Sequence, residues 1–185
     1  MKDLYKSLNE QNRNAPIYVD DGTLLSNKGF RKVPLTINWT TIDKILKKHG
    51  ILHEELYLLR EQIEDCILVA NSFTREGSII IFIKQWDESG REIMLSIALN
   101  EKDNEMNVSR ITSIYGRDNT ENFIKKLYEE NKIIAFDKLG GKWLEAVGIK
   151  LPNELSSFDY VKERLCPFSI AVFIVKKKLT PPIEL

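Results

Sequence analysis

One stretch of the sequence combines a strand pattern with a dense set of hydroxyl and basic side chains. It runs from Asn107 to Arg117 and reads NVSRITSIYGR. β-Branched residues are frequent in it, and Gly116 followed by an Asp-Asn pair is typical of the end of a strand. An ordinary core strand would turn one wholly apolar face inward, whereas this strand ends in Ser113, Tyr115 and Arg117. Ser113, Tyr115 and Arg117 are therefore candidate site residues.

The alternation of side chains along this strand predicts which residues share a face. A period of two puts Asn107, Ser109, Ile111, Ser113 and Tyr115 on one face, and Val108, Arg110, Thr112 and Ile114 on the other. Neither set is wholly apolar, so we expect the strand at the rim of a sheet or in a polar cleft. The alternative is a solvated strand in which Tyr115 is half buried and Ser113 is hydrogen-bonded to backbone.

The two histidines are the other candidates for chemistry. His49 and His53 are the only histidines in the chain. No acidic third ligand stands at a suggestive spacing, and the sequence has no Gly-rich phosphate loop, HExxH, GxSxG or paired cysteines, so we expect no metal or cofactor. A histidine with a pKa near 6.5 could still act as general base or acid. The simpler interpretation of each is a helix cap or a half-buried polar residue.

Composition and charge restrict the possible partners. The chain has 185 residues, with 27 basic and 27 acidic side chains, so it carries no overall positive charge for binding nucleic acid. A bound polyanion would need a local basic surface. No apolar run approaches the ~20 residues of a membrane span, and the N-terminus does not resemble a secretory signal. Cys66 and Cys166 match no metal or redox spacing, and we expect buried, reduced thiols in a cytoplasmic protein without a membrane partner.

The pattern of turns and periodicity predicts one main domain. Residues 1–36 are rich in Asn, Asp, Gly and Ser, and we expect an extension with little regular structure except a short strand at 17–19. Residues 37–175 are expected to form a single α+β domain, followed by a tail at 176–185. This domain is predicted to be an antiparallel meander of about four to six strands, with two N-terminal helices packed on one of its faces.

The individual elements are expected in the following order. Helices are predicted from Thr40 or Thr41 to His49 and from about 53 to 64, and later at 118–128 and 137–147, with a short one at 158–165. Strands are predicted at 66–71, 78–86, 91–99, 107–117, 132–136 and 167–175, with a polar loop at 100–106. Residues 79–83 are apolar on both faces, so this strand is expected in the centre of the sheet.

This order of elements resembles the C-terminal domain of phage MuF-type proteins, within the broader grouping of phage-associated Barnase–EndoU–colicin–RelE-like nucleases. The likeness spans about residues 38–155. It is carried by the segments 45–51, 69–72, 93–99, 108–117 and 132–138.

The resemblance implies metal-independent cleavage of RNA by attack of a 2′-hydroxyl on the adjacent phosphate. In that case His49 would act as base or acid, Arg117 would hold the phosphate, and Ser113 and Tyr115 would donate hydrogen bonds to its oxygens.

Further residues would bind the substrate under this hypothesis, namely Ser72, Arg110 and Lys126. The implied partners are RNA, with tRNA as one candidate, and an immunity protein, in the cytoplasm of a bacterial host or phage-infected cell. One alternative is a non-catalytic module of the same fold that binds a protein or nucleic acid. Another is a purely structural phage domain, and the neutral charge favours these two.

Overall fold

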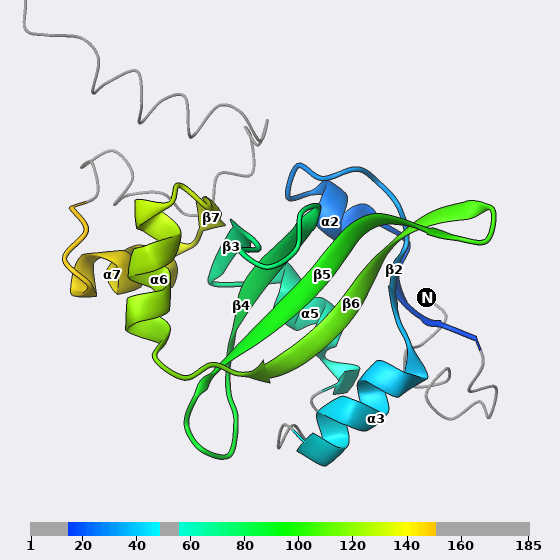
Figure 1. The fold of residues 1–185 in the computed structure, drawn as a ribbon, viewed down its shortest axis with the longest axis horizontal. Coiled ribbons are helices and arrows are strands. Elements are labelled where there is room, and N and C mark those ends of the chain that lie inside the picture. The colour runs from blue at the N-terminus through cyan, green and yellow to red at the C-terminus, as the bar shows by residue number, and fades with distance from the viewer. Residues whose placement is uncertain (1–14, 49–55, 151–185) are drawn as a thin grey trace, which may run out of the picture.

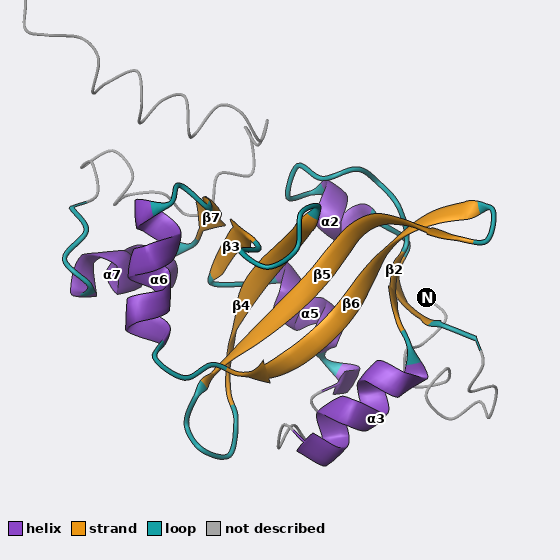
Figure 2. Cartoon of the chain, in the orientation of Figure 1, coloured by secondary structure: helices purple, strands orange, loops and turns teal. Residues whose placement is uncertain are grey.

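The computed structural model describes residues 15–48 and 56–150, which form one mixed sheet with helices on both of its faces (Figures 1 and 2). The strands are β1 (Ile17–Asp20), β2 (Leu35–Ile37), β3 (Leu68–Asn71), β4 (Ser78–Trp86), β5 (Glu92–Asp103), β6 (Met106–Gly116) and β7 (Ile133–Phe136). The helices are α2 (Thr23–Ser26), α3 (Trp39–Lys48), α5 (Leu59–Glu64), α6 (Thr120–Glu129) and α7 (Lys138–Ala146).

The seven strands lie in the order β1-β2-β6-β5-β4-β3-β7. The run from β3 to β6 is an antiparallel meander, as predicted. The whole sheet is not, because β2 pairs in parallel with β6. The prediction of a pure antiparallel meander of four to six strands is therefore wrong in strand count and in this pair, because strands from the N-terminal segment extend the sheet beyond β6 and β7 returns beside β3.

The expected short strand at 17–19 is present as β1, but the rest of residues 15–36 has more regular structure than the expected extension. Residues 15–36 form β1, α2 and most of β2, and Leu25 and Leu35 are completely buried. The turn between β1 and α2 is built by the Asp20 carboxylate, which accepts hydrogen bonds from the backbone N–H groups of Gly22 and Leu24. Gly22 has a φ of 101°, and a Cβ at this position would lie 2.5 Å from the carbonyl oxygen of Val33. Only glycine fits this turn without strain.

The larger core lies on one face of the sheet, which we call the covered face. Trp39, Ile42 and Ile45 of α3 and Leu59 and Ile63 of α5 are buried there. They pack with strand residues that include Val69, Ile79, Ile81, Leu95, Ile97, Ile111 and Ile114. The two predicted N-terminal helices thus contribute to one core, although residues 49–55 between them lie outside the described part of the chain.

The second face of the sheet is covered only in part. α6 and α7 pack at the end formed by β7, β3 and β4, where Phe82 makes edge-to-face contacts with Phe123 and Trp143. Figure 1 shows both helices at this end, while no described helix lies over β5 and β6 on the same side. We call this side of β5 and β6, which no described helix covers, the open face.

The β5–β6 hairpin is longer than the sequence predicts. Residues 100–106 were expected to be a polar loop, but β5 continues to Asp103 and β6 begins at Met106. Asn104, at the tip, has a φ of 54°, which asparagine tolerates better than most residues. The polar composition of this segment reflects a two-stranded arm that projects beyond β4 (Figure 2).

The thiol of Cys66 is buried and makes no disulfide, as predicted, whereas Cys166 lies outside the described residues. Burial raises the pKa of the Cys66 thiol, which keeps it in the unreactive protonated form. The predicted helix at 158–165 and strand at 167–175 also lie outside the described residues.

Candidate functional site

A β-bulge in β6 decides which side chains reach the open face. Ser113 lies opposite Ser96 and Ile111 opposite Ile97, so Thr112 is an extra residue between these pairs. Its hydroxyl donates to the carbonyl oxygen of Ser96 at 3.1 Å. The bulge shifts the alternation by one residue.

The predicted alternation of faces in β6 therefore holds within each half of the strand, but it does not hold across the bulge. Ile111 and Ile114 both enter the covered core, while Arg110, Ser113 and Tyr115 belong to the opposite side of the sheet. The expectation that Ile111 shares a face with Ser113, and Arg110 with Ile114, is wrong because strict alternation ignores the extra residue.

Tyr115 and Ser113 lie on neighbouring rows of the open face. Tyr115 is paired with Met94 and packs against the smaller core, and Ser113 is paired with Ser96. Both Tyr115 and Ser113 are half-buried. This strip presents polar side chains to solvent over an apolar base.

Arg117 directly follows β6, and its backbone N–H, its carbonyl and its guanidinium each make a contact that fixes its position. Its backbone N–H donates to the Glu92 carbonyl at 2.8 Å, and its carbonyl accepts from the Thr120 hydroxyl at 3.1 Å. Its guanidinium carbon lies 4.0 Å from the centre of the Phe123 ring, in cation–π geometry. The buried Nε has no hydrogen-bond partner among the described residues. The guanidinium is thus fixed by stacking rather than by a carboxylate.

Lys126 reaches the same aromatic group from α6. Its Nζ lies 4.9 Å from the centre of the Phe73 ring, and Phe73 contacts Phe123 edge-to-face with 5.5 Å between ring centres. Lys126 also pairs loosely with Glu130 at 3.7 Å. The structure therefore brings the predicted residues Arg117 and Lys126 together around two phenylalanines that the sequence analysis did not single out.

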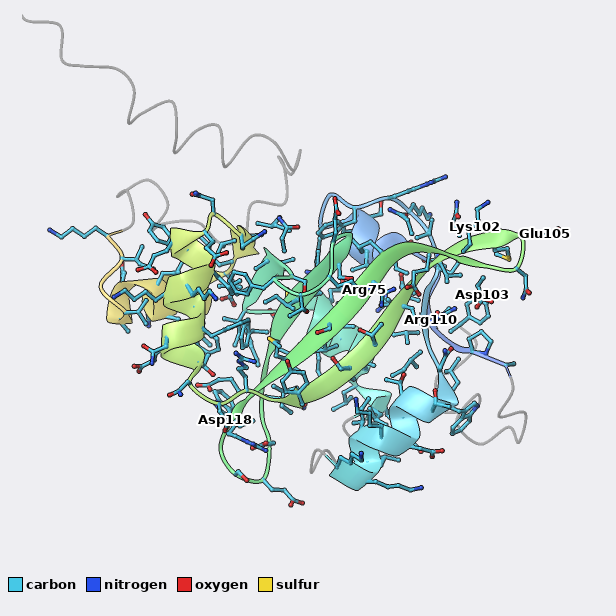
Figure 3. The ribbon with its side chains drawn as sticks, in the orientation of Figure 1. Arg75, Lys102, Asp103, Glu105, Arg110 and Asp118 are labelled. Carbon is cyan, nitrogen blue, oxygen red and sulfur yellow. The ribbon has the colours of Figure 1, made fainter. Side chains whose placement is uncertain are left out.

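Arg110 belongs to a different cluster. Its guanidinium pairs with Asp103 at 2.9 Å and with Glu101 at 3.4 Å (Figure 3). Arg117 lies seven positions further along the chain, which corresponds to roughly 20 Å. A single phosphate cannot contact both arginines.

Ser72 has a local role in the described structure. Its hydroxyl accepts from the backbone N–H of Thr74 at 3.2 Å and is 3.3 Å from the Thr74 hydroxyl. These contacts shape the turn that leads to Phe73.

His49 and His53 lie outside the described residues, so the predicted catalytic role of His49 is not decided. The described turns of α3 pack on the covered face, on the other side of the sheet from Ser113 and Tyr115.

A model of the phage MuF C-terminal domain matches residues 41–139. The chain belongs to this family. The match supports the resemblance to the phage domain and says nothing of nuclease activity. No curated protein and no solved structure matches the chain.

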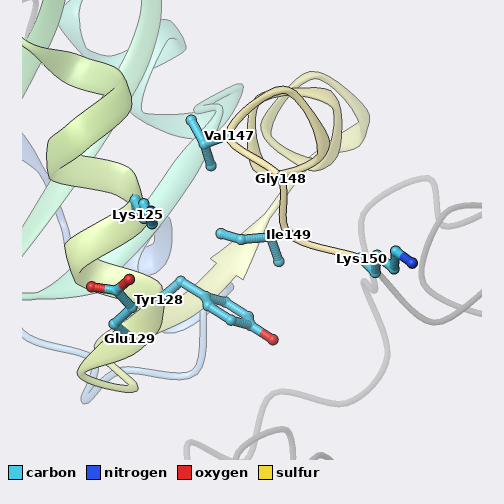
Figure 4. Close-up of a pocket in the computed structure, with 7 residues that line it drawn as sticks. All are labelled: Lys125, Tyr128, Glu129, Val147, Gly148, Ile149 and Lys150. Atoms are coloured by element: carbon cyan, nitrogen blue, oxygen red, sulfur yellow. The ribbon is translucent and has the colours of Figure 1, made fainter.

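In this MuF-family chain an open pocket of about 580 Å³ lies between α6 and the segment after α7 (Figure 4). Lys125, Tyr128, Glu129 and residues 147–150 line it, and none of the predicted site residues does. Within residues 15–48 and 56–150, no group of three or more His, Cys, Asp or Glu side chains is placed to hold a metal ion. None of the helices described there is long and apolar enough to cross a membrane.

The roles of Phe123 and Arg75 were missed in the sequence analysis, because each role depends on a contact with a segment that is distant in sequence. Phe123 falls in the apolar stripe of α6, and helical periodicity assigns such a residue to the core without showing which cations border its ring. Arg75 lies in the loop before β4 and meets Glu101 only because β4 and β5 pair.

Proposed function

We propose that this chain is a phage- or prophage-encoded domain that cleaves RNA without a metal, with the open face of β5 and β6 as its RNA-binding surface. The observation that carries the proposal is the end of β6. Ser113 and Tyr115 share one face there, and Arg117 follows with its guanidinium fixed over Phe123. Two cations, Arg117 and Lys126, flank this strip.

The chemistry needs a base, an acid and stabilisation of the charge that develops on phosphorus. The 2′-oxygen loses its proton to the base and attacks the adjacent phosphorus, and the 5′-oxygen leaves with a proton from the acid. Arg117 and Lys126 would offset the extra negative charge of the five-coordinate phosphate, and Ser113 and Tyr115 would donate hydrogen bonds to its oxygens. His49 is the proposed base or acid.

The first test is turnover of total cellular RNA in the presence of a chelator. We expect Arg117→Ala to lose on the order of 30- to 1000-fold in rate, equivalent to about 2–4 kcal/mol of transition-state stabilisation. Arg60→Gln is the matched control, because Arg60 lies on α5 at the covered face and pairs with Asp20 and Glu64. Equal background cleavage by wild type and Arg117→Ala would refute the proposal.

A second test addresses His49. His49→Ala is expected to lose a comparable factor and to flatten the pH–rate profile near neutrality, because a group with a pKa near 6.5 is then absent. Cleavage by His49→Ala with an unchanged pH profile would remove this residue from the mechanism.

A non-catalytic binding module is the second candidate, and one observation favours it. The charge of Arg110 is balanced by Asp103 and Glu101, and the chain as a whole is neutral. The open face would then recognise RNA or a protein of the host. RNA binding without turnover in the same assay would select this function. For the ribonuclease, the expected immunity protein would cover the same face.

A further inference from the structure

Two arginines from separate segments meet at one carboxylate on the open face. Arg75, in the loop between β3 and β4, pairs with Oε1 of Glu101, and Arg110 of β6 pairs with Oε2 of the same residue at 3.4 Å. Asp103 holds the other side of the Arg110 guanidinium at 2.9 Å. In Figure 3, Arg75 and Arg110 both lie over the hairpin that carries the two acids.

The exposure of these side chains shows that the cluster is accessible from solvent. The side chain of Arg75 is 55% exposed, and those of Arg110 and Glu101 are 22% and 21% exposed. A carboxylate between two guanidiniums occupies the position that a phosphate takes in an arginine pair, since both anions accept parallel N–H bonds. Glu101 thus stands where an external oxyanion would bind.

Unused donors lie in the same part of the sheet. The buried Nε of Arg110 has no hydrogen-bond partner among the described residues, and neither has the hydroxyl of Ser78, a residue that is only 7% exposed. Ser78, Ala98 and Arg110 form one cross-strand row, and the small Ala98 side chain separates the other two. Buried polar groups are normally satisfied, so unpaired donors next to the arginine pair point to a missing acceptor.

We propose that Arg75 and Arg110 form a second phosphate subsite for single-stranded RNA, and that a backbone phosphate replaces Glu101 when RNA binds. The inference rests on the proposed function for the identity of the ligand. The subsite lies roughly 20 Å along β6 from Arg117, so one extended strand of several nucleotides reaches both. The Ser96–Ser113 pair lies between the two ends of this track, where the bases of the bound strand would pass.

The affinity for an RNA that cannot be cleaved tests this subsite independently of catalysis. The probe is a fluorescent RNA octamer methylated at every 2′-oxygen, which cannot be cleaved by 2′-hydroxyl attack, in the presence of chelator. Arg75→Gln is expected to weaken binding about tenfold at low salt and to reduce the slope of log K against log salt by about 0.7, the loss of one phosphate contact. Glu101→Gln is expected to tighten binding about threefold, because the competing carboxylate is gone.

The two variants are expected to act in opposite directions, which a loss of folding cannot produce. Arg60→Gln, on the covered face, is the charge-matched control and should bind as wild type does. Unchanged affinity in both Arg75→Gln and Glu101→Gln would overturn the subsite, and tighter binding of a duplex than of the octamer would overturn the preference for a single strand.

The outcomes for the subsite and for the proposed function can be told apart. RNA turnover that depends on Arg117 but not on Arg75 or Glu101 would refute the subsite and leave the ribonuclease proposal intact. Octamer binding that depends on Arg75 and Glu101, without turnover of unmodified RNA, would refute cleavage and support the subsite. Absence of any RNA binding by wild type would refute both.

Discussion

The two faces of the central hairpin differ in what covers them, although the same strands form both. On the covered face, Ile93, Leu95 and Ile97 of β5 are buried beneath α3 and α5. On the other face, Met94 and Ala98 of the same strand are also buried, and Ser96 between them is half-buried. β4 lies between helices on both sides and is accordingly apolar on both, with Ile79 and Ile81 on one side and Ile80 and Phe82 on the other.

The larger core thus lies on the side of the sheet opposite to the proposed binding surface. The covered face supplies the larger continuous core, and side chains there touch other apolar groups on every side. The larger core packs against the opposite side of the same strands, and the open face carries residues such as Ser96, Ser113 and Arg110. Substitutions on the two faces should therefore have separable effects.

The largest effect on folding is expected for Leu95→Ala on the covered face. Leu95 is completely buried in the larger core, and the lost contacts and the cavity should reduce the free energy of unfolding by about 3–4 kcal/mol. Chemical denaturation measures this change. A loss below about 1 kcal/mol would mean that the covered face does not dominate stability.

An intermediate effect is expected for Asp87→Asn, in the turn that joins β4 to β5. Burial alone would raise the pKa of the Asp87 carboxyl, but hydrogen bonds from the Arg91 side chain and from the backbone N–H groups of Arg91 and Ser89 outweigh it and hold the pKa below its usual value of 3.8. We expect the variant to lose about 1–2 kcal/mol of unfolding free energy near neutral pH.

The pH dependence of this loss follows from the direction of the pKa shift. A carboxyl with a lowered pKa in the folded state contributes its stabilisation fully above the unfolded-state pKa, and the contribution disappears as pH falls through the folded-state pKa. The stability curves of wild type and Asp87→Asn should therefore converge in acid. A difference that is constant from neutral pH to below about pH 2 would contradict this role of the charge.

The smallest effect on folding is expected for Ser96→Ala on the open face. Ser96 is half-buried, so the free energy of unfolding should change by no more than about 0.5 kcal/mol. Paired with Leu95→Ala, its immediate neighbour, it compares the two faces at one place in the sheet. A loss comparable to that of Leu95→Ala would show that the open face is also part of the core.

The sequence predicted the meander well where the periodicity was strong. The strand at 78–86 matches β4, and β7 and α6 lie within two residues of their predicted bounds. The predicted period of two was wrong in β6, where a bulge inserts an extra residue. The bulge at Thr112 reverses the faces of β6 after Ile111, and no residue type announces it.

β2 and the contacts around the site residues could not be predicted from local sequence, because both depend on pairing between distant segments. Leu35 and Ile37 belong to a three-residue strand that is too short for a pattern and is held by pairing with β6. Arg117 and Lys126 were predicted from residue type, but their shared aromatic support was not. The ion pairs of Arg110 were also outside the reach of sequence, because Asp103 and Glu101 were assigned to a loop.

The parallel pairing of β2 with β6 has a consequence for where this domain can be cut. The family match begins at residue 41, after both β1 and β2. A fragment that starts there would lack Leu35 and Ile37, which are almost fully buried in the larger core. It would also leave the backbone N–H and C=O groups of β6 from Ser109 to Ile111 without their neighbour, turning an interior strand into an unprotected sheet edge. Such a fragment should self-associate, and an independently folding unit should therefore begin before Leu35 so that it includes β2.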